Sequence, residues 1–189
     1  MRDPKPRLID RFDPMGAGPA YPWSNKIERV LWQAVWLLLF RYSPTPFFGW
    51  RRMLLRLFGA DIAPGVRIHS SAKVWLPRNL TIGARSLIGP GVRLYDQGRI
   101  VIGERTVISQ YAHLCASSHD VRDVDFRLVE RPIRVGSACW IAAEAFVGPG
   151  VTVGDGAVLS ARGVLFNDVG ELEICRGNPA IPIGKREQL

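Results

Sequence analysis

One histidine stands in the setting best suited to proton transfer. His119 and Asp120 end the polar run Ser117, Ser118, His119, Asp120. An unperturbed imidazole titrates near pH ~6.5, so a neutral His119 could take a proton close to neutral pH, while Asp120 could orient the ring or meet a substrate. The residues alone leave a second interpretation open, in which His119 is a solvated loop histidine without a catalytic role.

The same neighbourhood contains residue types that bind metals or act as nucleophiles. His113, Cys115 and His119 could ligate zinc, but no further histidines follow at ligand spacing. Cys115 beside a histidine could act as a nucleophile, although a single cysteine of this kind is more often inert packing. We therefore expect no metal site and no covalent enzyme intermediate.

The sequence around these residues repeats every six positions. An aliphatic residue, called an anchor below, recurs at this spacing three times, and then the series begins again. Each new series begins twenty residues after the previous one, which is two residues more than three hexads. Neither the strand period of two nor the helix period of 3.6 explains this spacing. Three short strands per triangular turn do explain it, because the anchors then stack inward as one core of a parallel β-helix. The anchors are Ile62, Ile68, Val74, Ile82, Ile88, Leu94, Ile102, Ile108, Leu114, Val135, Ile141, Val147, Val153, Leu159 and Leu165.

The fourth place after most anchors holds a small residue. Ser86, Thr106, Ala112, Cys139 and Ala145 are examples. We interpret these residues as the places where the chain turns sharply at an edge of the prism.

The repeat is interrupted once. Ile102 and Val135 open equivalent strands but lie 33 positions apart instead of twenty. The extra residues must leave the prism after Leu114 as a loop over residues 115–132, and this loop contains His119. A loop held out by a rigid scaffold is a common place for chemistry.

Composition indicates one globular protein whose two parts differ in charge. The chain has 189 residues, of which 47% are hydrophobic. Residues 1–60 carry ten Lys and Arg against four Asp and Glu, whereas the charges of residues 61–189 are nearly balanced. We expect residues 1–60 to form an extended arm plus two short helices. We expect residues 61–189 to form the β-helix with a C-terminal tail. Three cysteines without a secretion signal predict reduced thiols in the cytoplasm.

The two expected helices cover residues 24–42, with Ser24 as a candidate N-cap, and residues 47–58. The apolar run 30–40 has eleven residues, about half of the ~20 that a membrane-spanning helix requires. The helices could cap the open end of the prism or pack on a neighbouring subunit. Alternatively, they could lie in a membrane interface, with Arg51, Arg52 and Arg56 beside anionic lipid.

Apolar residues also fall on the outer surface of the predicted prism. Trp140 lies eighteen residues before Val158, and Phe146 lies eighteen before Val164, so each pair should stack on one outer face. Exposed apolar strips usually mark an interface, and we favour a homotrimer. The alternative is that the N-terminal helices cover these strips.

Seven stretches of the chain match the motifs of one known family: 37–40, 49–60, 77–83, 107–120, 140–143, 147–152 and 177–180. They resemble the colanic-acid-type (exopolysaccharide) O-acetyltransferases, which are hexapeptide-repeat acyltransferases, and the resemblance extends over nearly the whole chain from about residue 25. It implies a left-handed β-helix, although parallel crossovers are usually right-handed and the spacing fixes no hand.

The resemblance implies a trimer with active sites between adjacent subunits and acetyl-CoA as the acetyl donor. It places His119 on the catalytic base of the family, acting on a carbohydrate hydroxyl by direct transfer. The acceptor would be a sugar unit of an exopolysaccharide or of its lipid-linked precursor at the inner face of the membrane.

The resemblance also implies where the donor lies. Backbone groups near Ala142, Ala143 and Ala161 would face the pantetheine arm, and Lys185 and Arg186 could meet the nucleotide phosphates or be plain solvated charge. Trp140 would wall the cleft or pack in an interface. Phe166 and Asn167 replace the Thr-Lys pair of relatives, which removes a hydroxyl and a cation from the expected coenzyme region.

Other functions remain open from the sequence. N-acetylation of an amino sugar, acetylation of a small free acceptor such as serine, and a non-catalytic β-helix scaffold are the alternatives. A pI of about 10.0 could suggest nucleic-acid binding, but the basic residues lack base-stacking platforms and modular motifs, so we expect no nucleic-acid partner.

Overall fold

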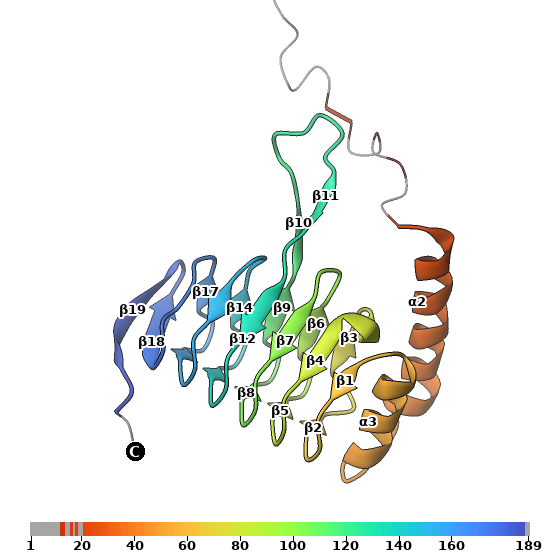
Figure 1. Cartoon of the computed structure of the whole chain (residues 1–189), viewed down its shortest axis with the longest axis horizontal. Helices are drawn as coiled ribbons and strands as arrows, with labels where there is room; N and C mark the ends of the chain where they lie inside the picture. The colour runs from red at the N-terminus through yellow and green to blue at the C-terminus, as the bar shows by residue number, and fades with distance from the viewer. Residues whose placement is uncertain (1–11, 14–15, 17, 19–20, 188–189) are drawn as a thin grey trace, which may run out of the picture.

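The computed structural model describes residues 12–13, 16, 18 and 21–187, so most of the predicted N-terminal arm lies outside the described residues. The chain from residue 61 onward winds as a prism with three faces (Figure 1). Successive strands pass from face A to face B to face C and back to A, and strands on one face pair in parallel with those of the next turn.

Each face is one sheet. Face A contains β1 (Asp61–Ile62), β4 (Leu80–Ile82), β7 (Ile100–Ile102), β12 (Ile133–Val135) and β15 (Thr152–Val153). Face B contains β2 (Arg67–Ile68), β5 (Leu87–Ile88), β8 (Val107–Ile108), β13 (Trp140–Ile141), β16 (Val158–Leu159), β18 (Glu173–Gly177) and the antiparallel β19 (Ala180–Lys185). Face C contains β3 (Lys73–Val74), β6 (Arg93–Tyr95), β9 (His113–Cys115), β14 (Phe146–Val147) and β17 (Val164–Leu165).

The predicted aliphatic anchors form the core, as the six-residue repeat requires. All fifteen are buried, with exposures from 0% at Ile88 to 7% at Val74. Ile62 pairs with Ile82, and Ile82 pairs with Ile102, so the twenty-residue restart is one turn of the prism. Ile102 in turn pairs with Val135, which confirms that the extra residues leave the repeat.

The structure corrects our explanation of the small residues at the fourth place. The left-handed backbone that turns the chain falls one position earlier, as at Arg85 (φ 60°) and Arg105 (φ 53°). The fourth-place Ser86 and Thr106 follow with buried side chains. These residues are small because they point into a prism corner, where there is little space, and not because they make the turn.

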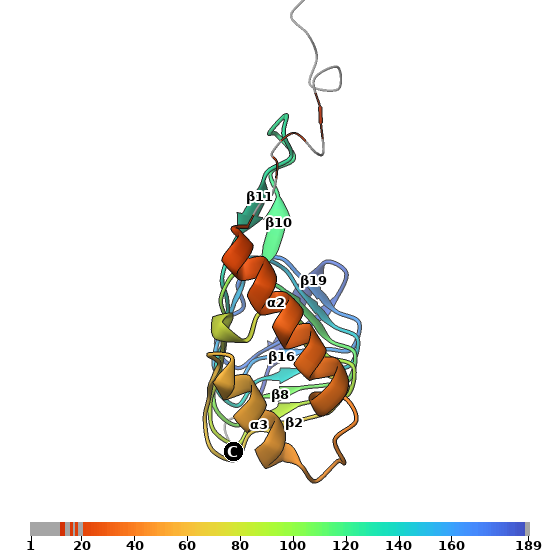
Figure 2. The same cartoon turned by 90° about the vertical axis from the view of Figure 1, so that its right-hand side faces the viewer.

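Two helical segments close the N-terminal end of the prism (Figure 2). They are α2 (Trp23–Val35), which continues as the π-helical turn η1 (Trp36–Phe40), and α3 (Phe48–Leu57); a short 3-10 turn, η2 (Pro77–Asn79), precedes β4. The expected capping role of Ser24 is wrong, because Pro22 is the N-cap residue and Ser24 lies inside α2.

Side chains from these helices replace the missing first turn. Strand N–H groups of the prism donate to carbonyls of the next turn, as Ala63 N does to Ile82 O, whereas corner residues donate backward, as Arg85 N does to Pro64 O. The strand carbonyls of the first turn therefore lack a preceding strand that would donate to them. Five of them are instead satisfied by five helix side chains. The pairs are Arg56 with Ile62 O, Arg52 with Val66 O, Arg51 with Ile68 O, Trp36 with Ala72 O and Trp32 with Val74 O.

The three α3 arginines therefore donate to carbonyls of the prism. One of our two expectations, that they lie beside anionic lipid, is wrong. Arg51 is fully buried and donates to Ser43, Pro44 and Thr45 as well as to Ile68 O. An open sheet edge with unpaired carbonyls invites pairing with another chain, and these side chains prevent it. The helices thus cap the prism.

Candidate active site

His119 lies on a hairpin that leaves the prism at the corner between faces C and A. The hairpin consists of β10 (Ser117–His119) and β11 (Leu128–Glu130), and His119 pairs with Leu128. It projects away from the prism (Figure 1). Cys115 still pairs within face C, so the excursion begins one residue later than the predicted Cys115.

The imidazole of His119 is held by one neighbouring residue. Its Nδ1 lies 2.6 Å from Phe126 O, and the Phe126 ring stacks on it with centroids 4.3 Å apart and planes 5° from parallel. A carbonyl oxygen only accepts hydrogen bonds, so in the neutral ring the proton is on Nδ1 and the lone pair is on Nε2. Nε2 is therefore the atom that can take a proton.

The hairpin tip places the Phe126 carbonyl. Phe126 has a left-handed backbone (φ 51°), which a bulky residue adopts at a cost of order 1–3 kcal/mol when the surroundings require it. Arg127 forms ion pairs with Asp123 and Asp125 beside it. Asp120 accepts a hydrogen bond from Arg122 N at 2.9 Å, so Asp120 shapes the tip, and Phe126 orients the ring.

A cleft of about 740 Å³ opens beside His119. Its walls include Asp120, Arg131, Pro149 and Phe166. The sequence analysis missed Arg131, Pro149 and Phe126 as site residues. Arg131 and Pro149 could have been found, because Arg131 ends the predicted loop and Pro149 follows an anchor on the face from which the loop leaves.

Buried polar side chains fix the root of the hairpin. Ser117 Oγ donates to Gln97 Oε1, and Asn79 Nδ2 donates to the backbone carbonyls of Asp96 and Gln97. Asp96 Oδ1 accepts hydrogen bonds from Trp75 N and Leu76 N, whereas its Oδ2 is buried without a partner. Burial raises the pKa of Asp96 to about 7.

The predicted donor-binding residues lie elsewhere on the prism. Ala142, Ala143 and Ala161 lie at the corner between faces B and C. The Ala142 amide is already used, since it donates to Leu159 O, and Ala143 O accepts from Arg162 N. Trp140 is half exposed on face B and donates to Ser109 Oγ.

The two basic residues of the tail differ from each other. Lys185 is exposed in β19, opposite Glu173. Arg186 Nη1 donates to Ala138 O at 2.9 Å and to Gly156 O at 3.0 Å, so part of its guanidinium is engaged within the chain. One protomer thus places His119 at one corner and the donor candidates at a different corner and on face B.

Cys115, Cys139 and Cys175 are free, and Cys115 Sγ donates to Ser117 O. Among the residues that the structure describes, no group of three His, Cys, Asp or Glu side chains is arranged to hold a metal ion.

Comparison with known proteins decides the family. No family model matches the chain. The colanic acid biosynthesis acetyltransferase WcaF of Escherichia coli (strain K12) is 44% identical over 163 residues, which cover 86% of this chain and 90% of that protein. The chain belongs to the WcaF-like hexapeptide-repeat acetyltransferases.

Solved structures similar to this chain show the fold. A galactoside acetyltransferase in complex with coenzyme A has a TM-score of 0.80 at 20% identity, covering 96% of this chain and 92% of that one. A hexapeptide-repeat acetyltransferase from Vibrio cholerae, complexed with acetyl-CoA, has a TM-score of 0.74 at 21% identity, covering 90% and 93%. The prediction of a left-handed parallel β-helix is confirmed, and this WcaF-like protein is an acetyltransferase.

Proposed function

We propose that this WcaF-like acetyltransferase moves an acetyl group from acetyl-CoA to a sugar hydroxyl of an exopolysaccharide unit or of its lipid-linked precursor. His119 Nε2 takes the hydroxyl proton as the oxygen attacks the thioester carbon. The resulting oxyanion collapses, the carbon–sulfur bond breaks, and the thiolate receives the proton from His119. No enzyme nucleophile takes part.

The observation that carries this proposal is the fixed His119 ring on a chain that is 44% identical to WcaF. Phe126 binds Nδ1 and leaves Nε2 available beside an open cleft. Acetyl-CoA as the donor is supported by the coenzyme bound in the two similar structures. The Ala143 amide is our candidate donor to the oxyanion, and Lys185 and Arg186 are our candidates for the phosphates.

We propose a homotrimer because one protomer does not bring the two halves of the site together. His119 lies at the corner of faces C and A, whereas Ala143 and Ala161 lie at the corner of faces B and C. A neighbouring copy with its B–C corner against the His119 hairpin would complete the site. Trp140, half exposed above Val158 on face B, provides an apolar surface for this contact.

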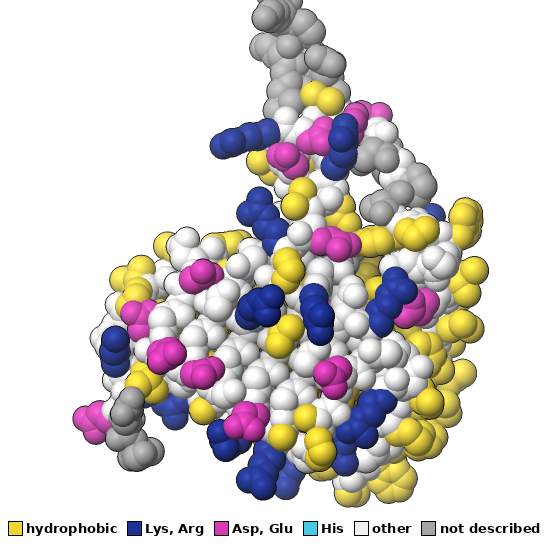
Figure 3. Space-filling view, in the orientation of Figure 1, with side chains coloured by type: hydrophobic (Ala, Val, Ile, Leu, Met, Phe, Trp, Pro, Cys, Tyr) yellow, Lys and Arg dark blue, Asp and Glu magenta, His cyan; other side chains and the backbone are white. Residues whose placement is uncertain are grey.

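We also propose that residues 61–189 are the catalytic unit and that residues 1–60 are an arm and cap. The protein would lie in the cytoplasm, with the cap touching the inner face of the membrane. No helix in the described part of the chain is long and apolar enough to cross a bilayer. Large apolar side chains nevertheless cover the outer surface of the helices (Figure 3), including Trp23, Leu38 and Leu57, each at least 70% exposed. Lys26 and Arg41 stack on neighbouring rings there and could meet anionic lipid.

Product analysis tests the reaction. The purified full chain is incubated with acetyl-CoA and either an oligosaccharide without amino sugars, an amino sugar or serine, and the products are analysed by mass spectrometry before and after mild alkali. We expect one added acetyl group on the oligosaccharide that alkali removes, because an ester is labile and an amide is not. An alkali-stable product formed from the amino sugar would instead establish N-acetylation.

A further inference from the structure

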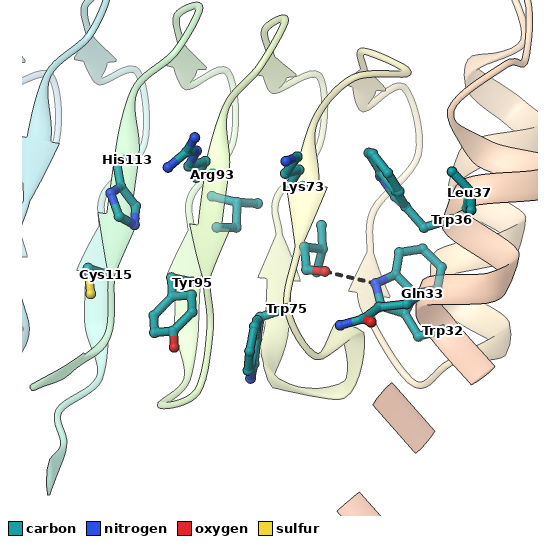
Figure 4. Close-up of a pocket in the computed structure, with 12 residues that line it drawn as sticks. Trp32, Gln33, Trp36, Leu37, Lys73, Trp75, Arg93, Tyr95, His113 and Cys115 are labelled. Atoms are coloured by element: carbon teal, nitrogen blue, oxygen red, sulfur yellow. Dashed lines mark hydrogen bonds between the residues drawn. The ribbon is translucent and has the colours of Figure 1, made fainter. Parts of the chain in front are cut away.

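A second cleft, of about 640 Å³, lies between the N-terminal helices and face C (Figure 4). Two short rows of side chains form its floor. Lys73, Arg93 and His113 occupy equivalent positions in β3, β6 and β9, and Trp75, Tyr95 and Cys115 each lie two residues further along the chain. Because neighbouring strands are ~4.8 Å apart, each row is a ladder with that spacing.

The row of Lys73, Arg93 and His113, the upper one in Figure 4, is electropositive. Lys73 and Arg93 are exposed, and no carboxylate of a described residue pairs with either. The residues that line the cleft, within the described part of the chain, include no Asp or Glu. Burial and the nearby Arg93 lower the pKa of His113, so its ring is neutral near pH 7, and its buried Nε2 has no partner.

The other row, the lower one in Figure 4, contains two aromatic residues, Trp75 and Tyr95. The rings of Trp75 and Tyr95 lie 4.8 Å apart at 52°, and the guanidinium of Arg29 covers Trp75 at 4.2 Å. Trp36 closes the helix side of the cleft, and its position is fixed by a hydrogen bond to Ala72 O. Aromatic faces beside unpaired cations fit a flat-sided polar ligand with negative charge.

The cleft is connected to His119 along face C. The His113 ring contacts Phe146 at 5.4 Å, and Phe146 contacts Phe166 at 5.6 Å. Phe166 in turn lines the cleft beside His119. From β6 to β17 this path crosses three strand spacings, roughly 14 Å, which is enough for a ligand of several sugar rings.

We propose that this cleft binds an anionic unit of the acceptor glycan, a sugar that carries a phosphate or a carboxylate. Lys73 and Arg93 bind the anion, Trp75 and Tyr95 bind the ring face, and the rest of the glycan extends along face C toward His119. The assignment rests on the proposed function, because it specifies the acceptor of that same reaction.

Binding of small sugars without acetyl-CoA tests this assignment separately from catalysis. Calorimetry on the full chain compares α-glucosyl phosphate, glucuronic acid and methyl glucoside, for wild type and for the double variant Lys73→Met/Arg93→Met. We expect at least one anionic sugar to bind about tenfold or more tightly than methyl glucoside, and less so as salt increases. The double variant should lose that preference, and the control Arg134→Met, an exposed arginine on face A, should keep it.

The pattern of results is decisive either way. A preference for the phosphate or for the carboxylate supports the proposal and identifies the anion. Equal affinity for all three sugars, no measurable binding of any, or a preference that survives in the double variant would overturn it. None of these results depends on whether an acetyl ester forms, so failure of the cleft assignment and failure of the reaction are distinguishable.

Discussion

Replacing Arg51 should destabilise the protein more than replacing any exposed arginine. Its buried guanidinium donates to Ile68 O at 2.6 Å, to Pro44 O at 2.9 Å and to Thr45 O at 2.6 Å. Arg51→Met leaves these three carbonyls without their donor, at roughly 1–3 kcal/mol for each acceptor that water cannot reach. Removing a buried charge offsets part of this cost, so we expect a net loss of about 3–5 kcal/mol.

Urea unfolding followed by circular dichroism measures this loss, at one protein concentration for all variants because assembly contributes to stability. With an m-value of about 2 kcal/mol/M, the midpoint should fall by about 2 M. Arg134→Met, on an exposed site, should stay within about 0.5 kcal/mol of wild type. If Arg51→Met does not fold, Arg52→Met, which removes the single bond to Val66 O, should cost about 1 kcal/mol. Midpoints equal to wild type in both variants would refute the capping role.

Three further predictions concern pH, the histidine and the assembly. Burial raises the pKa of Asp96 from 3.8 to about 7, so the unfolded chain releases this proton first and wild-type stability is lost as pH rises from ~4 through ~7. Asp96→Asn should therefore be close to wild type in melting temperature near pH ~4 and exceed it at pH 8, and a difference that stays constant with pH would contradict this. Phe126→Ala keeps the backbone carbonyl that binds His119 Nδ1 but removes the stacked ring. We expect kcat to fall about tenfold while the KM for acetyl-CoA changes little. An unchanged kcat would mean that stacking does not position His119. Co-expressed His119→Ala and Ala143→Trp chains should recover acetyl transfer that neither has alone, because mixed trimers would contain one intact site between subunits; no recovery in verified mixed trimers would place the site within one chain.

Much of the fold could be predicted because one physical requirement repeats along the sequence. Every strand must direct one aliphatic residue inward, so Ile62, Ile82 and Ile102 show the register, and the 33-residue gap before Val135 locates the excursion. Handedness could not be derived, because a six-residue spacing is the same in either coil. It came from resemblance and is confirmed by the similar structures.

The helix arginines illustrate where sequence reasoning was wrong. Alternation of Arg51, Arg52 and Arg56 with apolar residues is typical of a membrane-surface helix. The sequence does not show that the first turn of a solenoid presents five carbonyls without strand donors, and this unmet need turns the arginines inward. The apolar side chains on the outer surface of the helices are what remains for a membrane.

The candidate site was partly predictable for a similar reason. His119 stands out by residue type and by its place on the excursion. The group that orients its ring is the backbone carbonyl of Phe126, and backbone carbonyls carry no sequence signature. The sequence offered the adjacent Asp120 for this role, but Asp120 Oδ1 accepts a hydrogen bond from Arg122 N in the hairpin tip instead.

The most direct test of the account is acetyl-CoA turnover with a glycan acceptor by wild type and His119→Ala. We predict a loss of at least ~10²-fold in kcat, the size expected when a general base is removed, with the melting temperature nearly unchanged because the side chain is exposed on the hairpin. A variant as active as wild type would contradict the assignment of His119 Nε2 as the atom that takes the proton.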